Sequence, residues 1–176
     1  MNNNIAVFGA VKGPNGLLGN MAPTPITYKG QEWRTSEALF QAMRFNDVEI
    51  RETIRAKTSP MSAKWAAKAA MKARPDAMIV TPQSEADIAN MRWILINKFN
   101  ANKAARTQLM ATGDAIIVED TTKQNGKSSG FWGAKLQADG TWIGGNMMGT
   151  LLMELRAKYQ AKYQAIRDAR AAAKQD

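Results

Sequence analysis

The sequence predicts an α+β fold: a single helix-rich domain with short antiparallel strands and a long C-terminal helix. In several long stretches, apolar residues recur at spacings of three and four, which is typical of amphipathic helices. The strand-like apolar runs are short and lie beside turn sequences near both ends of the chain. A length of 176 residues suits one domain with a substantial core, and we find no internal repeat or linker.

The first third of the chain alternates strands, turns and helices. Residues 4–8 are expected to form a short strand, and residues 26–28 and 31–33 a β-hairpin. A helix follows, with Thr35 or Ser36 as its N-cap, because a side-chain oxygen there accepts a backbone N–H that has no partner within the helix.

Two further helices are predicted from Asp47 and from Ser59-Pro60, since aspartate and serine are good caps and proline is tolerated at the first helical position. The second of these, residues 61–73, should pack closely through its alanines, Trp65 and Met71. Its lysines recur every four residues and form a basic stripe: Lys64, Lys68 and Lys72. Such a stripe is more often a solvated face than a binding site.

A longer helix is expected to open at Thr81-Pro82, and another to run from Asn102 to Gly113. The apolar stripe of the first is Ile88, Met91, Leu95 and Phe99. Residues 115–118 should form a buried strand that places Glu119 and Asp120 at its end.

The last third begins with a long polar loop at residues 121–130, which suits a substrate loop or a tolerated insertion. Asp139-Gly140 predicts a hairpin between residues 135–137 and 141–143. Asn146 is the predicted cap of the last helix. Its buried side should comprise Leu151, Leu152, Leu155 and Tyr159. From about residue 158 the helix becomes polar and cationic.

Composition excludes several classes of enzyme. Without cysteine or histidine, the chain cannot form a disulfide, a thiolate nucleophile, a zinc–sulfur site or a Ser-His-Asp triad. Proton transfer would fall to Asp, Glu, Lys or Tyr. We find neither a signal peptide nor the roughly 18 apolar residues that a membrane helix needs. We therefore expect a cytoplasmic protein without a membrane partner.

The chain is strongly basic, since 24 Lys and Arg exceed 15 Asp and Glu by 9 and the isoelectric point is near 9.9. This charge favours anionic partners such as nucleic acid or phosphorylated metabolites, although many ordinary proteins are equally basic.

Glu37, Gln41 and Arg44 are the first candidate site residues, because their spacing places a carboxylate, an amide and a guanidinium on one helical stripe. The stripe suits either a solvated face or the wall of a polar pocket, and Glu37 in a first turn also complements the helix dipole. Trp132 suits a core position or a stacking platform. Gly144-Gly145-Asn146 suits anion binding by backbone N–H groups or a simple connection.

Taken in order, these motifs resemble the YbiA-like, or NADAR, family. The resemblance rests on Gly-Leu-Leu-Gly-Asn-Met at residues 16–21 and Trp-x-Thr-Ser-Glu-x-x-Phe-Gln-Ala-x-Arg-Phe at residues 33–45. It continues through shorter motifs at residues 59–63, 98–99, 109–112, 118–119, 132–133 and 146–156. It covers about residues 5–158, so we expect a NADAR-like domain over 1–158 and a basic helical extension over 159–176.

The resemblance implies an N-glycosidase that cleaves the bond between a ribose anomeric carbon and an exocyclic base amine, without a metal or cofactor. It places Glu37 at the family's functional glutamate. It also implies substrate contacts by Asn20, Gln41, Arg44, Trp132, Gly133, Asn146 and Gly149. The sequence departs from the family at Ala38, where a histidine is usual. It also departs before Trp132, where an acid is usual, so a second carboxylate would come from Glu119 or Asp120.

The resemblance leaves three candidate functions. The first is removal of ADP-ribose from guanine in DNA, which the net charge of +9 favours. The second is cleavage of ribosylaminopyrimidine phosphates, intermediates of riboflavin synthesis, whose phosphate would also suit a basic pocket. The third is a non-catalytic module that binds ADP-ribose or nucleic acid.

Overall fold

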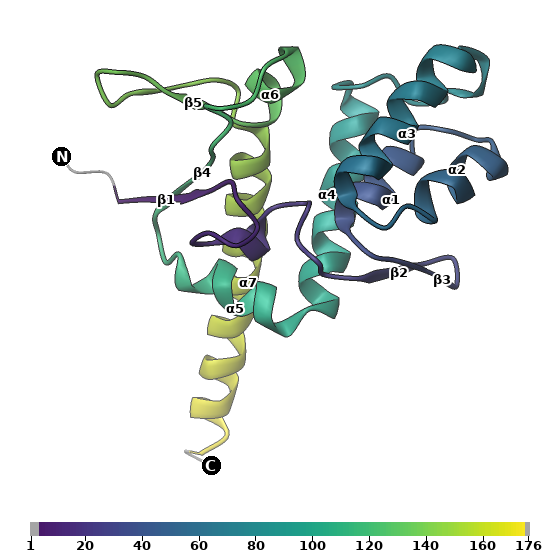
Figure 1. Ribbon diagram of the computed structural model, residues 1–176. Coiled ribbons are helices and arrows are strands. Elements are labelled where there is room, and N and C mark those ends of the chain that lie inside the picture. Colours follow the sequence, from purple (N-terminus) through teal and green to yellow (C-terminus); the bar gives the residue numbers. More distant parts are fainter. Residues whose placement is uncertain (1–3, 175–176) are drawn as a thin grey trace. The chain divides into compact units, whose positions relative to one another are not determined.

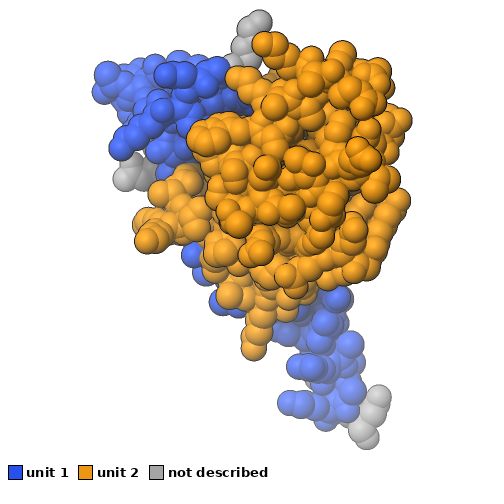
Figure 2. Space-filling model, turned by 45° about the vertical axis from the view of Figure 1, so that its right-hand side comes forward, with its two compact units in different colours: residues 1–7, 107–176 blue, residues 8–106 orange. Residues whose placement is uncertain are grey.

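The computed structural model describes residues 4–174 (Figure 1). The chain forms two compact units, coloured separately in Figure 2: residues 8–106 form unit 2, and residues 1–7 with 107–176 form unit 1. Helices and short antiparallel hairpins occur together, and the last helix is the longest described. The predicted α+β class is therefore confirmed.

Unit 2 contains an antiparallel hairpin and a cluster of helices. The strands β2 (Ile26–Tyr28) and β3 (Gln31–Trp33) form the predicted hairpin, with Ile26 opposite Trp33. The helical elements are η1 (Gly16–Leu18), α1 (Ser36–Ala42), α2 (Val48–Arg55), α3 (Pro60–Ala73), η2 (Pro75–Ala77) and α4 (Glu85–Ala101). The next helix, α5 (Lys103–Ala111), starts in unit 2 and ends in unit 1.

Side-chain caps fix where the helices of unit 2 begin. Thr35 accepts a hydrogen bond from the Ala38 N–H at 3.2 Å and caps α1. Asp47 caps α2 and Ser59 caps α3, so these predicted starts are confirmed. Ser84 caps α4, which therefore begins later than the predicted opening at Thr81-Pro82.

The core of unit 2 is built around α1, all seven residues of which are buried, and this helix packs against α2, α3 and α4. The prediction that Trp65 packs closely is wrong, since its side chain is 65% exposed. The predicted packing through alanines is confirmed, since Ala63 and Ala67 are the buried residues of α3 and their small side chains let the helices approach closely. Because α1 is buried throughout, most of its polar side chains are expected to find partners within the protein.

In unit 1, β1 (Ile5–Phe8) pairs with β4 (Ile116–Glu119), and α7 (Met147–Ala172) packs against β4. Two short strands, β5 (Lys135–Leu136) and β6 (Trp142–Ile143), form the hairpin predicted around Asp139-Gly140. The predicted buried side of the last helix is confirmed, since Leu151, Leu152, Leu155 and Tyr159 are all buried. Beyond residue 160 this helix has no buried residue up to residue 174, and the boundary expected at residue 158 stays a prediction.

The predicted loop at 121–130 is shorter than expected, because α6 (Lys127–Trp132) takes in its last residues. The turn before α6 is held by hydrogen bonds from the Thr121 hydroxyl to the carbonyls of Ser129, at 3.0 Å, and Ala134, at 3.2 Å. Between residues 4 and 174, no helix is long and apolar enough to cross a bilayer.

Candidate functional site

A chain of hydrogen bonds along α1 links three of the predicted site residues. Gln41 Nε2 donates to Glu37 Oε1 at 2.8 Å, and Arg44 Nη1 donates to Gln41 Oε1 at 2.9 Å. The Glu37 side chain is buried, and the residue is only 6% exposed. The stripe is therefore a buried polar network rather than a solvated face.

Arg44 is anchored by a residue that the sequence analysis did not select. Asp87, on α4, is fully buried and accepts from Arg44 Nε at 2.8 Å and from Nη2 at 2.7 Å. Asp87 also accepts the backbone N–H of Gln83 at 2.8 Å. The guanidinium lies over the Phe40 ring, 4.4 Å from its centroid. This bidentate pair holds Arg44 in place, and Arg44 is the last member of the hydrogen-bond series that begins at Glu37.

Asn20 lies against the start of α1. Its backbone oxygen accepts the Glu37 N–H at 3.1 Å, and its side-chain Nδ2 approaches the Met91 sulfur at 3.0 Å. Within residues 4–174, the buried Asn20 Oδ1 and the buried Ser36 Oγ have no hydrogen-bond partner. Both unpaired oxygens belong to neighbours of Glu37. Ser36 directly precedes Glu37 in the sequence, and Asn20 accepts the Glu37 N–H.

Lys98, also on α4, holds the backbone that leads to Asn20. Its ammonium donates to the carbonyl of Gly19 at 2.8 Å and to that of Leu18 at 3.3 Å. The side chain is fully buried, and this desolvation lowers the pKa of Lys98 from 10.5 to about 7.

A signal for Asp87 and Lys98 was present in the sequence. Asp87, Met91, Ile94 and Lys98 step by four, three and four, so the two charged residues occupy the buried stripe of α4. A charged residue at a core position needs a partner, which marks it as part of a structured polar site. Their partners were out of reach, since Arg44 lies 43 positions from Asp87 and Gly19 lies 79 positions from Lys98.

In unit 1, Asn146 links β4 to the start of α7. Its Nδ2 donates to the Ile117 carbonyl at 2.8 Å, and its Oδ1 accepts the Glu119 N–H at 3.1 Å. The predicted side-chain cap is therefore wrong: Asn146 stands at the N-cap position with a φ of 45°, but its side chain makes no capping bond because both amide atoms bind β4.

Gly133 and Gly149, both predicted to contact substrate, lie where the backbone is crowded. A Cβ on Gly149 would stand 2.1 Å from the Ile117 oxygen, and one on Gly133 would stand 2.6 Å from the Glu119 oxygen. Real Cβ atoms do not approach so closely, so both positions exclude any side chain. Close packing against β4 thus accounts for both glycines, and their contact with substrate stays a prediction.

The remaining predicted residues also lie in unit 1. Asp120 accepts the Thr122 N–H at 2.8 Å and thereby stabilises its own turn. Glu119 is half-buried at the end of β4. Trp132 is 9% exposed, and its ring meets that of Phe131 edge to face, with centroids 5.1 Å apart. The structure thus brings Glu37, Gln41, Arg44 and Asn20 together in unit 2, whereas Glu119, Asp120, Trp132, Gly133, Asn146 and Gly149 belong to unit 1.

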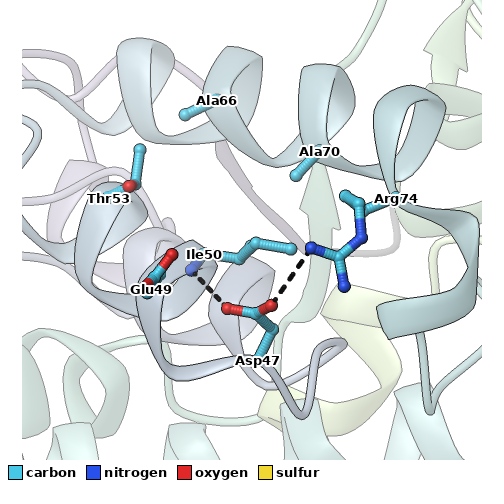
Figure 3. Close-up of a pocket in the computed structure, with 7 residues that line it drawn as sticks. All are labelled: Asp47, Glu49, Ile50, Thr53, Ala66, Ala70 and Arg74. Atoms are coloured by element: carbon cyan, nitrogen blue, oxygen red, sulfur yellow. Dashed lines mark hydrogen bonds and ion pairs between the residues drawn. The ribbon is translucent and has the colours of Figure 1, made fainter.

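A separate pocket of about 200 Å³ lies between α2 and α3 (Figure 3). Asp47 and Arg74 form an ion pair at 3.5 Å across one end of it. Ala66 and Ala70 line the α3 side. None of the predicted site residues lines this pocket. In the described part of the chain, no cluster of three or more His, Cys, Asp or Glu side chains is placed to hold a metal ion.

Comparison with known proteins identifies the family. Residues 7–160 match the NADAR domain. Over 157 residues the chain is 34% identical to the N-glycosidase YbiA of Escherichia coli strain K12, with 89% of each chain covered. Over 147 residues it is 31% identical to a riboflavin biosynthesis protein of Vibrio vulnificus, covering 83% of this chain and 36% of that protein.

A solved structure supports the same conclusion. The NMR structure of Escherichia coli YbiA superposes with a TM-score of 0.72 at 31% identity, covering 93% of this chain and 89% of that one. The resemblance inferred from the ordered motifs is therefore confirmed. Because the family match spans most of the chain, this protein belongs to the NADAR family.

Proposed function

We propose that this protein is an N-glycosidase that hydrolyses the bond between a ribose anomeric carbon and an exocyclic base amine. Glu37 is the catalytic carboxylate in this proposal. The single observation that carries the proposal is the buried hydrogen-bond network from Glu37 through Gln41 and Arg44 to Asp87. Glu37, Gln41 and Arg44 lie on the stripe that their spacing predicted, and Asp87 joins them from α4. The relatives named as N-glycosidases supply the reaction class.

The chemistry requires a negative charge next to the sugar. As the bond breaks, the anomeric carbon becomes oxocarbenium-like, and a fixed carboxylate stabilises that charge. Gln41 binds Glu37 Oε1, and no hydrogen bond within residues 4–174 engages Oε2. One oxygen is thus held in position while the other stays available for the substrate.

The atoms balance in a simple hydrolysis. Water gives its hydroxyl to the anomeric carbon, and its hydrogen accompanies the departing amine nitrogen. Glu37 suits both the electrostatic task and the transfer of that proton, because chains without histidine must use another acid or base. Asn20, whose backbone oxygen accepts the Glu37 N–H, would contact the ribose.

For the substrate, we propose ADP-ribose attached to guanine in DNA. The net charge of +9 and the exposed cationic end of α7 support this choice, because both attract a polyanion. For unit 1, the family resemblance implies a base contact by Trp132, a phosphate contact at Asn146 and a second carboxylate from Glu119 or Asp120. Asn146 would act there through its position at the start of α7, since its amide already binds β4.

A ribosylaminopyrimidine phosphate is the second candidate substrate. The similarity to a riboflavin biosynthesis protein favours it. Its single phosphate would need far fewer cationic contacts than DNA does.

Offering the two substrates separately tests the proposal. Mass spectrometry would follow release of free ADP-ribose from modified DNA and of free base from the pyrimidine compound. We expect turnover of the modified DNA, and loss of that turnover in Glu37→Gln, which keeps the side-chain shape and removes the charge. Turnover of the pyrimidine compound alone would move the substrate to the second candidate. Tight binding of either substrate without any product would show a non-catalytic binding module and refute the enzyme.

A further inference from the structure

One face of α3 carries a set of exposed side chains that the site described above does not use. Trp65 is 65% exposed and Met61 is 41% exposed. Lys68 and Lys72 are exposed on the same helix. We call these four residues the α3 strip.

Helical geometry places the α3 strip on one narrow face. At 100° per residue, Met61, Trp65, Lys68 and Lys72 fall within an arc of about 60°. The buried residues of the helix, Ala63 and Ala67, point to the opposite side. The pocket of Figure 3 lies on a third side, at Ala66 and Ala70, and its acidic residues belong to α2. The strip is therefore solvent-facing.

The strip is also uniformly positive. The α3 sequence contains three lysines and no aspartate or glutamate. Neither Lys68 nor Lys72 forms an ion pair or a hydrogen bond with any residue between 4 and 174, so their charges are not neutralised within the described chain. An anionic partner would gain their full attraction.

An exposed tryptophan between cations has a specific chemical complement. Indole rings stack on nucleobases of any sequence, and lysines one turn away bind the backbone phosphates. We propose that the α3 strip binds single-stranded nucleic acid, with a base stacked on Trp65 and phosphates at Lys68 and Lys72. A single strand suits the strip because its bases are free to stack, whereas those of a duplex are already stacked on one another.

A membrane surface fits these observations less well. A helix that lies in a bilayer interface needs a broad apolar face opposite its cations. The apolar face of α3 is buried in unit 2, and the strip offers only Met61 and Trp65 in the same arc as the lysines. The proposal for the α3 strip does not depend on which ribosylated amine the protein cleaves.

Binding of an unmodified, fluorescently labelled single-stranded oligonucleotide tests the proposal, measured by anisotropy at several salt concentrations with the full chain. Trp65→Ala should weaken binding about 5- to 150-fold, the loss expected for one stacked base, without changing the salt slope. Lys68→Ala with Lys72→Ala should lower the slope of log affinity against log salt by about 1.4, from two lost phosphate contacts. Since these side chains are exposed, circular dichroism should show all variants folded.

The matched control removes two charges elsewhere in unit 2, as Lys12→Ala with Lys103→Ala, and should leave the slope unchanged. An equal loss in this control would show that net charge alone attracts the strand and would overturn the proposal. Unchanged affinity in Trp65→Ala would overturn it too, as would equally tight binding of a duplex. Binding to anionic vesicles but not to the oligonucleotide would assign the strip to a membrane surface. Because the oligonucleotide carries no ADP-ribose, failure of this test does not bear on the proposed glycosidase activity. Equally, absence of glycosidase activity would not bear on binding by the α3 strip.

Discussion

The two units use buried polar side chains in different ways. In unit 2, Glu37, Gln41, Arg44 and Asp87 satisfy one another, side chain to side chain. In unit 1, the Asn146 amide satisfies backbone groups of β4 instead. The first arrangement keeps a carboxylate fixed but available, whereas the second uses both polar atoms of the amide to join a strand to a helix. Burial of a polar residue therefore does not by itself identify a reactive group. Whether the residue can act on a substrate depends on which partner it binds.

The largest expected effect is on the ion pair of unit 2. Asp87→Ala leaves the Arg44 guanidinium, 5% exposed, without its buried partner. We expect the free energy of unfolding to fall by about 3–5 kcal/mol. Denaturant titration measures this. The double variant Arg44→Leu with Asp87→Leu should recover much of the loss, because no unpaired charge remains.

An exposed ion pair provides the control. Asp76→Ala removes one of the two carboxylate partners of Arg74 at the surface, where water replaces it. Solvent screening should make the loss of stability small compared with that of Asp87→Ala. If Asp87→Ala were equally mild, the buried network would not be a rigid support for Glu37.

A smaller effect is expected from Asn146→Ala in unit 1. The change deletes two hydrogen bonds to β4 and leaves alanine at a φ of 45°. The free energy of unfolding should fall by about 2–3 kcal/mol. If Asn146 served only a substrate, the variant would lose activity but keep its stability, which would contradict the structural role assigned here.

Counted per pH unit, the smallest expected change in stability is the one that Lys98 confers. Its pKa is about 7 in the folded chain and 10.5 as a free side chain, so the unfolded chain binds more protons between these values. Stability should therefore rise from pH 7 toward pH 10.5, by up to about 1.4 kcal/mol per pH unit, and Lys98 should add no slope below pH 7. A neutral amine still donates to Leu18 and Gly19, so deprotonation costs neither bond.

Comparing the wild type with Lys98→Met isolates this contribution. The variant should show a flatter stability profile between pH 7 and 10. Parallel profiles would mean that Lys98 does not titrate in this window.

Interactions between residues close in sequence could be predicted, whereas interactions between distant residues could not. The caps at Thr35, Asp47 and Ser59 and the stripe from Glu37 to Arg44 depend on neighbours three or four positions away, so local spacing was sufficient. The Arg44–Asp87 pair depends on packing between helices, and no local pattern specifies it.

The errors have physical causes of the same kind. Trp65 stands at an apolar position of an alanine-rich helix, but the close approach of α1 selected alanines for the buried face. Asn146 has the residue type of a cap, but β4 lies 27–29 positions away in sequence and takes its amide.

The central claim is that Glu37 supplies the charge for catalysis, and single-turnover cleavage of ADP-ribosylated DNA tests it most directly. Glu37→Gln should keep the Gln41 hydrogen bond and the stability of the wild type, while the rate falls roughly 10²–10⁴-fold. Glu32→Gln, at an exposed position of β3, should keep the wild-type rate. A Glu37→Gln enzyme that cleaves as fast as the wild type would contradict the account.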